Sequence, residues 1–74
     1  MPKLRVLSAA EVCRILQRHG FEIVRQRGSH IILRKETAEG GITLPVPDHR
    51  ELARGTLKSI ILQSRIEAAE FMTS

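Results

Sequence analysis

The sequence predicts an α+β domain in the order α-β-β-β-α, with a three-stranded antiparallel sheet, two helices on one face and a short carboxyl-terminal helix. Three observations predict it. Apolar residues recur at three- and four-residue spacing near both ends of the chain, they alternate with polar residues in the middle, and glycine-containing turns separate the alternating segments. Short turns favour antiparallel neighbours, and two helices on one face bury a single apolar sheet face.

Length and composition are those of one folded domain. The 74 residues are 42% apolar and 27% charged, with no repeat or low-complexity tract. A chain this short buries only about 60% of its extended surface, which leaves enough apolar area for one small core. We therefore expect a single domain over residues 1–74.

The first helix is predicted to begin after Ser8. Ser8 and Glu11 have the spacing of a capping box, in which each side chain accepts a hydrogen bond from the other residue's backbone N–H. The residues expected on its buried face are Ala9, Val12, Ile15 and Leu16. His19 and Gly20 end the helix, and we expect His19 to interact with the negative end of the helix dipole rather than to take part in catalysis.

Two strands are expected over residues 21–26 and 30–35, joined by a Gly28-Ser29 turn. Alternation divides their side chains between two faces of the sheet. The side chains expected to face the helices are Phe21, Ile23, Ile31 and Leu33. Those expected on the opposite face are His30, Ile32 and Arg34. A bulge in the turn would exchange the two faces.

The third strand is expected over residues 42–46, after a polar loop over 36–41 that ends in Gly-Gly. Pro45 and Pro47 cannot donate hydrogen bonds to a neighbouring strand, so this strand should lie at an edge of the sheet or stop early. An irregular connection over residues 48–54 follows, with Leu52 against the core.

A second helix is expected to begin at Thr56 as its cap. Its predicted apolar face consists of Leu57, Ile60 and Ile61, with Lys58 and Arg65 outside. A short terminal helix over residues 66–72 should close one end of the core through Ile66 and Phe71.

The charge balance favours a nucleic-acid partner. Twelve Lys and Arg against eight Asp and Glu give a net charge of +4, and the pI is about 10.2. A solvated basic surface that binds nothing is the alternative interpretation. Aromatic residues make up only 3% of the chain, which argues against a binder that stacks successive bases on exposed rings.

The sequence contains no pattern typical of a metal site or a membrane segment. Cys13 is the only cysteine, so an intramolecular disulfide and a multi-cysteine zinc site are excluded, and we expect it to be buried. Glu36 and Glu39 share a loop without a His or Asp ligand pattern. The apolar run in residues 1–7 is too short for a signal peptide or a membrane span, so we expect a cytoplasmic protein.

His30 is the candidate for chemistry, because a histidine titrates near neutral pH, at roughly 6.5 when unperturbed. Cations close to it in sequence can attract anions and hold phosphates. These cations are Arg25, Arg27, Arg34 and Lys35. Together, His30 and these cations suggest catalysis on a phosphodiester. The alternative is that His30 has only a structural role in the strand.

Several motifs resemble the HicA toxin family, also called YcfA-like. They are Gly28-Ser29-His30, the segments over residues 44–49 and 51–60, the Gly20-Phe21 helix end and Glu70-Phe71. The resemblance covers nearly the whole chain. Two departures concern packing: Ile32-Leu33 replace an aromatic or bulkier residue often found after the histidine, and Ser64-Arg65-Ile66 replace a glycine that often separates the last two helices.

The resemblance implies a fold similar to double-stranded RNA-binding domains, an mRNA-cleaving activity with His30 as its catalytic residue, and a HicB-type antitoxin as partner. No cofactor is implied. The residues assigned to RNA binding on this basis are Arg25, Arg27, Ser29, Arg34, Lys35 and Lys58. Gly28 and His49 are assigned possible auxiliary roles.

Cleavage without a metal requires a base for the ribose 2′-hydroxyl and an acid for the leaving 5′-oxygen. His30 can serve as one of these, but it cannot hold both protonation states at once. His49 is a candidate for the other, although its polar Pro-Asp-His loop equally favours a turn-stabilising role. Ser29 is expected to orient His30 or to stabilise the turn.

Two other functions fit the same residues. A non-catalytic module could bind structured RNA through phosphates and 2′-hydroxyls, with salt-sensitive binding that does not need His30. A protein-interaction domain could instead dock an acidic partner on the basic face. An adjacent gene for a small acidic protein would agree with both the toxin and the interaction domain.

Overall fold

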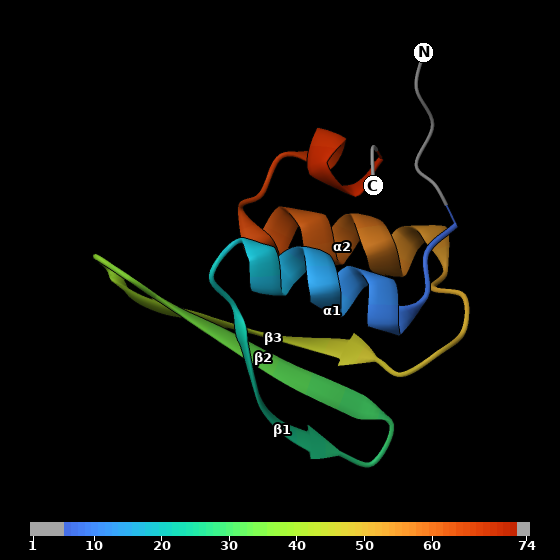
Figure 1. Cartoon of the computed structure of the whole chain (residues 1–74), viewed down its shortest axis with the longest axis horizontal. Helices are drawn as coiled ribbons and strands as arrows, with labels where there is room; N and C mark the ends of the chain where they lie inside the picture. Colours follow the sequence, from blue (N-terminus) through green and yellow to red (C-terminus); the bar gives the residue numbers. More distant parts are fainter. Residues whose placement is uncertain (1–5, 73–74) are drawn as a thin grey trace.

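A computed structural model describes residues 6–72 of the chain. The elements in order are α1 (Ala9–Arg18), β1 (Glu22–Arg27), β2 (His30–Thr37), β3 (Gly40–Pro47), α2 (Arg54–Ser64) and a 3₁₀ turn η1 (Ala68–Phe71). The strands form one antiparallel sheet in the order β1-β2-β3, and both helices cover the same face of it (Figure 1). This confirms the predicted α+β fold of the double-stranded RNA-binding-domain type.

The segment over residues 1–7, which was expected to contain no signal peptide, lies largely outside the described residues. Within residues 6–72, no helix has the length and apolar character needed to cross a membrane.

Helix α1 begins as predicted. The Ser8 hydroxyl accepts from the Glu11 backbone N–H at 3.1 Å, and Glu11 Oε1 accepts from the Ser8 N–H at 3.0 Å. The four residues predicted for its apolar face are all buried. Cys13 is buried beside them, and burial raises the pKa of its thiol, with the negative charge of Asp48 as a smaller cause. The expectation of a structural cysteine is confirmed.

The core lies between the helices and the inner face of β2 and β3. Leu33, Leu44 and Val46 of the sheet are fully buried under the helices. Leu7 and Phe71, one before α1 and one in η1, are also fully buried. The segments at both ends of the described chain therefore complete the core that the helices and the sheet begin.

The predicted strand faces hold for β2, with one correction in β1. Register pairs Ile31 with Val46 and Leu33 with Leu44 on the inner side, as expected. Phe21 is buried but lies just before β1 rather than in it. A bulge lies at Val24, between the Ile23 and Arg25 pairs, and the Gly28-Ser29 turn contains none, so the predicted faces of β2 are kept.

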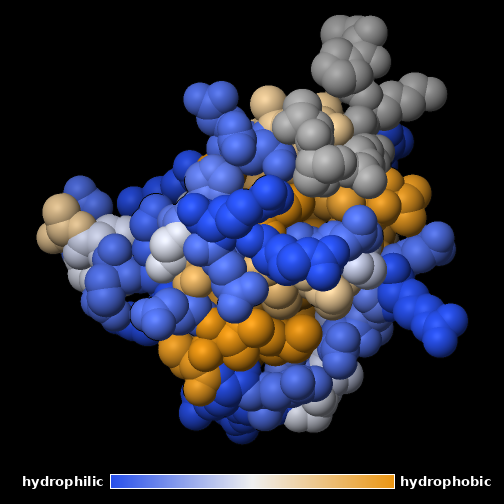
Figure 2. Space-filling model, viewed as in Figure 1, coloured by the Kyte–Doolittle hydropathy of each residue, from blue (hydrophilic) through white to orange (hydrophobic). Residues whose placement is uncertain are grey.

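The helices leave β1 largely uncovered. Ile23 pairs with Leu33 and so faces the helix side, yet its exposed fraction is 48%, and that of Val24 is 54%. Figure 2 shows hydrophobic surface in the part of the view where Figure 1 places β1 and β2. Ile23 therefore lies on the predicted face of the sheet but outside the core, because the helices do not cover β1.

The β2–β3 hairpin is longer than predicted. Residues 36–41 were expected to form a loop, but pairing continues from His30↔Pro47 to Thr37↔Gly40, which leaves only Ala38 and Glu39 in the turn. The end of this hairpin extends beyond the helices (Figure 1). Strand β3 is an edge strand, as its prolines predicted. Prolines are tolerated there because an edge strand needs no hydrogen-bond donor on its outer side.

Helix α2 begins earlier than predicted. Its cap is Ala53, whose carbonyl accepts from the Leu57 N–H at 2.9 Å, so Thr56 lies inside the first turn and is not the cap. The helix begins early because the buried Leu52 is anchored directly before it, where its N–H donates to the Leu7 carbonyl at 2.9 Å.

Helix α2 ends on two unusual residues. Ser64 is buried, and its hydroxyl donates to the Ile61 carbonyl at 2.8 Å and accepts from the Ile66 N–H at 3.1 Å. Arg65 follows in the left-handed conformation with φ of 63°. The terminal helix expected over residues 66–72 is only a 3₁₀ turn, because this left-handed residue and the extended Glu67 interrupt the helical path.

Replacing Arg65 with glycine should stabilise the protein. The left-handed conformation destabilises a residue that has a Cβ atom by roughly 1–2 kcal/mol, and glycine removes this strain. Part of the gain is offset because glycine also increases the conformational entropy of the unfolded chain. We expect Arg65→Gly to raise the free energy of unfolding by about 0.5–1 kcal/mol, measured by urea denaturation. Arg65→Ala removes the same exposed side chain and should leave stability nearly unchanged, whereas equal stabilisation by both variants would contradict the backbone explanation.

Candidate functional site around His30

His30 is the first residue of β2 and follows a two-residue turn. Gly28 has φ of 57°, and Ser29, the other central residue, has a negative φ, which is the pattern of a type II′ hairpin turn. Glycine meets this requirement without strain. The sequence therefore places a histidine directly after a rigid turn, with its side chain exposed on the sheet face opposite the helices.

The turn is fastened to the segment that follows β3. The Asp48 N–H donates to the Ser29 carbonyl at 2.7 Å. The side-chain amide of Gln26 lies 3.3 Å from Asp48 Oδ2 and 3.4 Å from the Gly28 carbonyl. Gln26 and Asp48 were not predicted from the sequence, because nothing in their spacing signals a contact between residues 22 positions apart. Ser29 contributes to this arrangement through its backbone.

Arg27 is the cation closest to His30 in the sheet register. It pairs directly with His30 across β1 and β2, a position in which the two Cβ atoms of a pair are about 4.5–5.5 Å apart. Arg25 pairs with Ile32 on the same outer face. Both arginines are exposed, and within residues 6–72 neither forms an ion pair or a side-chain hydrogen bond. Both guanidinium groups are thus free to bind an anion next to His30.

Arg34 shares the outer face but is already engaged. Its guanidinium donates to Glu36 Oε2 at 2.6 Å and to Thr43 Oγ1 at 2.8 Å. It lies four residues from His30 along β2, about 13 Å at the usual rise of a strand. Arg34 is therefore a more distant and partly neutralised cation.

Lys35 and Lys58, also predicted to bind RNA, are not brought to His30. Lys35 pairs with Ile42 on the inner face, and its Nζ lies 5.9 Å from the centroid of the Phe21 ring. Lys58 is exposed on α2 but does not line the pocket beside His30. The predicted group of cations is thus divided between two faces of the sheet and a helix.

A pocket of about 360 Å³ is lined by His30, by the edge strand β3 and by α2. The sheet contributes His30, Pro45 and Pro47. The residues that α2 contributes are Gly55, Thr56, Ser59, Ile60 and Gln63. The α2 side of this pocket was not predicted from the sequence, although the polar residues at positions 56, 59 and 63 have the spacing of one helix side.

His49 does not line that pocket. Its carbonyl accepts from the Ala9 N–H at the start of α1, and its N–H donates to the Pro47 carbonyl, both at 2.9 Å. The backbone of His49 therefore connects the end of the sheet to α1, which agrees with the turn-stabilising interpretation. Its exposed side chain forms no hydrogen bond within the described residues.

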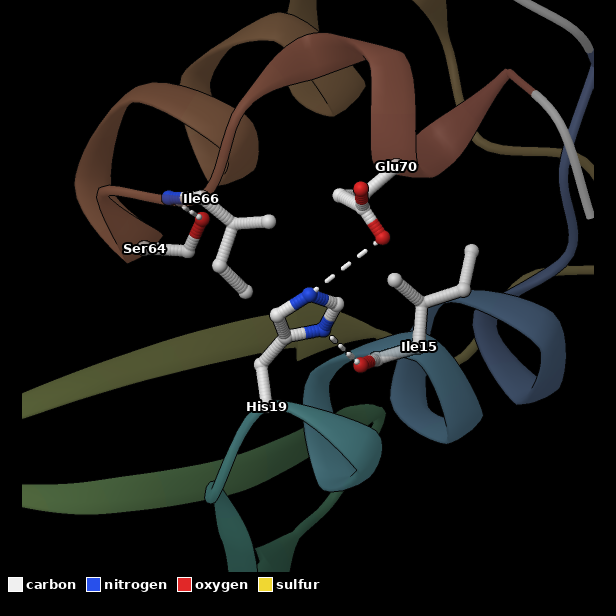
Figure 3. A network of polar contacts seen from close by, with 5 residues as sticks. All are labelled: Ile15, His19, Ser64, Ile66 and Glu70. Atoms are coloured by element: carbon white, nitrogen blue, oxygen red, sulfur yellow. Dashed lines mark hydrogen bonds and ion pairs between the residues drawn. The ribbon is translucent and has the colours of Figure 1, made fainter.

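The third histidine serves the fold. His19 Nδ1 donates to the Ile15 carbonyl at 3.0 Å, and Nε2 lies 3.4 Å from Glu70 Oε1 (Figure 3). The first contact satisfies a carbonyl at the end of α1, and the second connects α1 to η1. A second pocket, of about 430 Å³, lies here with Lys35 on its wall. The structural role predicted for His19 is confirmed.

No three His, Cys, Asp or Glu residues come together as a potential metal site within residues 6–72. The donor groups near His30 are instead guanidinium, hydroxyl and amide groups.

These features define a class of protein: a small basic α+β domain with an exposed histidine between free arginines and a polar pocket. The family model of the HicA toxin of bacterial toxin–antitoxin systems matches residues 9–66. The chain belongs to the HicA toxin family, whose members act with an antitoxin partner. A comparison with curated proteins finds no match.

Proposed function

We propose that this protein is an endoribonuclease that cleaves mRNA through His30 without a metal and is neutralised by a HicB-type antitoxin. Its substrate places it in the cytoplasm. The observation that carries the proposal is the position of His30, which is exposed, lies directly opposite the free Arg27 and lines a pocket. Membership of the HicA toxin family supports a catalytic role for a histidine in this position.

Cleavage requires two proton transfers. The 2′-oxygen forms a bond to phosphorus while the bond to the 5′-oxygen breaks, so the 2′-hydroxyl loses a proton and the 5′-oxygen gains one. His30 accepts the first proton or donates the second, as general acid–base catalysis requires. Water or a second group supplies the other transfer.

The arginines stabilise charge. Arg27 and Arg25 hold the phosphate on which negative charge develops, and charge-assisted hydrogen bonds from guanidinium suit this task. Arg34 contributes less because Glu36 already pairs with it. Ser29 and Gly28 act by fixing the turn from which His30 projects.

An antitoxin blocks this site by covering it. The outer face of β1 and β2 is basic, so an acidic HicB-type partner would be attracted to the same arginines that hold RNA. Binding and cleavage then compete for one surface.

The proposal is tested with purified protein and an mRNA in buffer containing EDTA. We expect cleavage in EDTA, and its loss when the HicB-type antitoxin is added in equal amount. RNA that is bound but remains intact would overturn the catalytic proposal in favour of a non-catalytic module for structured RNA. Cleavage only after addition of a divalent metal would overturn the metal-independent mechanism.

Arg27→Gln should slow cleavage by about 10- to 100-fold, because a hydrogen bond to a charged group contributes about 1.5–3 kcal/mol. Loss of one phosphate contact should also lower the slope of log affinity against log salt by about 0.7 for single-stranded RNA. Lys35→Gln is the matched control, since it removes one charge on the opposite face. Equal losses in the two variants would mean that overall charge, and not the position of Arg27, governs cleavage.

A further inference from the structure

The wall of the pocket opposite His30 is formed by one side of α2. Thr56, Ser59 and Gln63 lie three and four residues apart, so their side chains project from the same side of the helix. The Gln63 side-chain amide donates to Ser59 Oγ at 2.9 Å. This leaves the Ser59 hydroxyl proton and the Gln63 carbonyl oxygen, a donor and an acceptor side by side, without a partner within residues 6–72.

The pocket differs in chemistry from the basic face next to it. Among the residues that the structure describes, His30 is the only titratable one that lines it, and no Lys, Arg, Asp or Glu does so. Pro45 and Pro47 add apolar ring surfaces on the sheet side. Neutral hydrogen-bonding groups and apolar surface suit a nucleobase, whereas phosphates are held by cations.

The volume of the pocket also suits a small planar group. At about 360 Å³ it is near the lower end of the range for ligand pockets, about 300–1,000 Å³. Bases are often stacked on aromatic rings, but both phenylalanines of this chain are buried in the core. The proline rings and the His30 imidazole are the ring surfaces that this pocket offers instead.

We propose that this pocket binds the base of a nucleotide adjoining the cleaved phosphate, and that Ser59 and Gln63 select that base by hydrogen bonds to its edge. Thr56 supplies a third hydrogen-bonding group at the start of the wall. This inference rests on the proposed function, because it takes His30 as the point where the chain is cut. The arginines hold RNA of any sequence, and the α2 wall makes cleavage selective.

Cleavage sites in a mixed mRNA pool, mapped by sequencing the new 5′ ends, test the selectivity. We expect Ser59→Ala/Gln63→Ala to weaken the preference for the favoured base next to the cut by about 10-fold, the order of discrimination from one good side-chain-to-base pair. Leu62→Ala on the same helix is the matched control, since Leu62 is 80% exposed and does not line the pocket. An unchanged base preference in the double variant would overturn the proposal.

Binding of an uncleavable RNA separates this inference from the proposed function. The probe is a short RNA with 2′-fluoro groups, which lacks the attacking hydroxyl, followed by NMR of ¹⁵N-labelled protein. We expect backbone amide shifts at Thr56, Ser59 and Gln63 that depend on base identity. Shifts confined to β1 and β2 would overturn the base pocket even if mRNA is cleaved. Base-dependent shifts at the wall with no cleavage of natural RNA would support the pocket and overturn the nuclease.

Discussion

His30→Ala should lower the rate of mRNA cleavage by about 10²–10⁴-fold, the usual contribution of a general acid or base. The loss is expected because, within residues 6–72, His30 is the only titratable group that lines the pocket, and the free Arg25 and Arg27 lie on the same face of the sheet. Because its side chain is exposed, the free energy of unfolding should change by no more than about 0.5 kcal/mol. The measurement is the initial rate of cleavage of a defined mRNA by purified wild-type and variant protein at matched concentration.

The same pair can be compared in a host that lacks the antitoxin. Induction of the wild type should arrest growth with loss of total mRNA, and induction of His30→Ala to the same protein level should do neither. Cleavage by a cleanly purified, folded His30→Ala protein at the wild-type rate would refute the assignment. His49→Ala is informative beside it: an equal loss of rate would identify His49 as the second proton-transfer group, and an unchanged rate would leave it the structural role that its backbone contacts show.

Phe71→Ala should cost about 3–5 kcal/mol of unfolding free energy, the usual effect of removing a buried phenylalanine. Phe71 is fully buried although it lies in a short 3₁₀ turn near the end of the chain. For a domain of 74 residues the total stability is roughly 4–11 kcal/mol at the usual value per residue. The variant should therefore unfold at a much lower urea concentration than the wild type, as judged by urea denaturation followed by circular dichroism.

Phe71→Leu is the graded control, because it keeps most of the apolar volume and should cost less than half as much. Leu62→Ala, at an exposed position, should change stability little. Wild-type stability of Phe71→Ala would show that η1 is not part of the cooperative core. Phe71 and Leu7 lie outside residues 9–66, the part of the chain that matches the family model, yet both are buried in the core. The result therefore also shows whether segments outside the matched region are needed for a stable core.

Features set by neighbours three or four residues apart were predictable. The Ser8–Glu11 capping box and the buried face of α1 follow from spacing along a helix. Alternation after the turn placed His30 on the outer face, which the register confirms. Two prolines indicated the edge strand. In each case the interacting groups are close in sequence or constrain the backbone at their own position.

Errors at element ends have local explanations that only the packed structure reveals. Thr56 resembled a cap, but the anchoring of Leu52 starts α2 one turn earlier. Arg65 takes the left-handed conformation in the segment where the family often has a glycine, and an arginine gives no sign of that conformation in the sequence. Propensity could not decide either case because tertiary contacts of neighbouring residues outweigh differences of about 1 kcal/mol.

The sequence by itself determined the fold class, the family and the place of His30 after a rigid turn. Only the tertiary structure decided which residues surround it. It put Arg27 directly across from His30, sent Lys35 to the opposite face, and brought α2 alongside to form a pocket. The physical reason is that helix docking brings residues 25 to 33 positions from His30 beside it. Strand register decides which side chains share its face, and both are set by the burial of the whole core rather than by any local pattern.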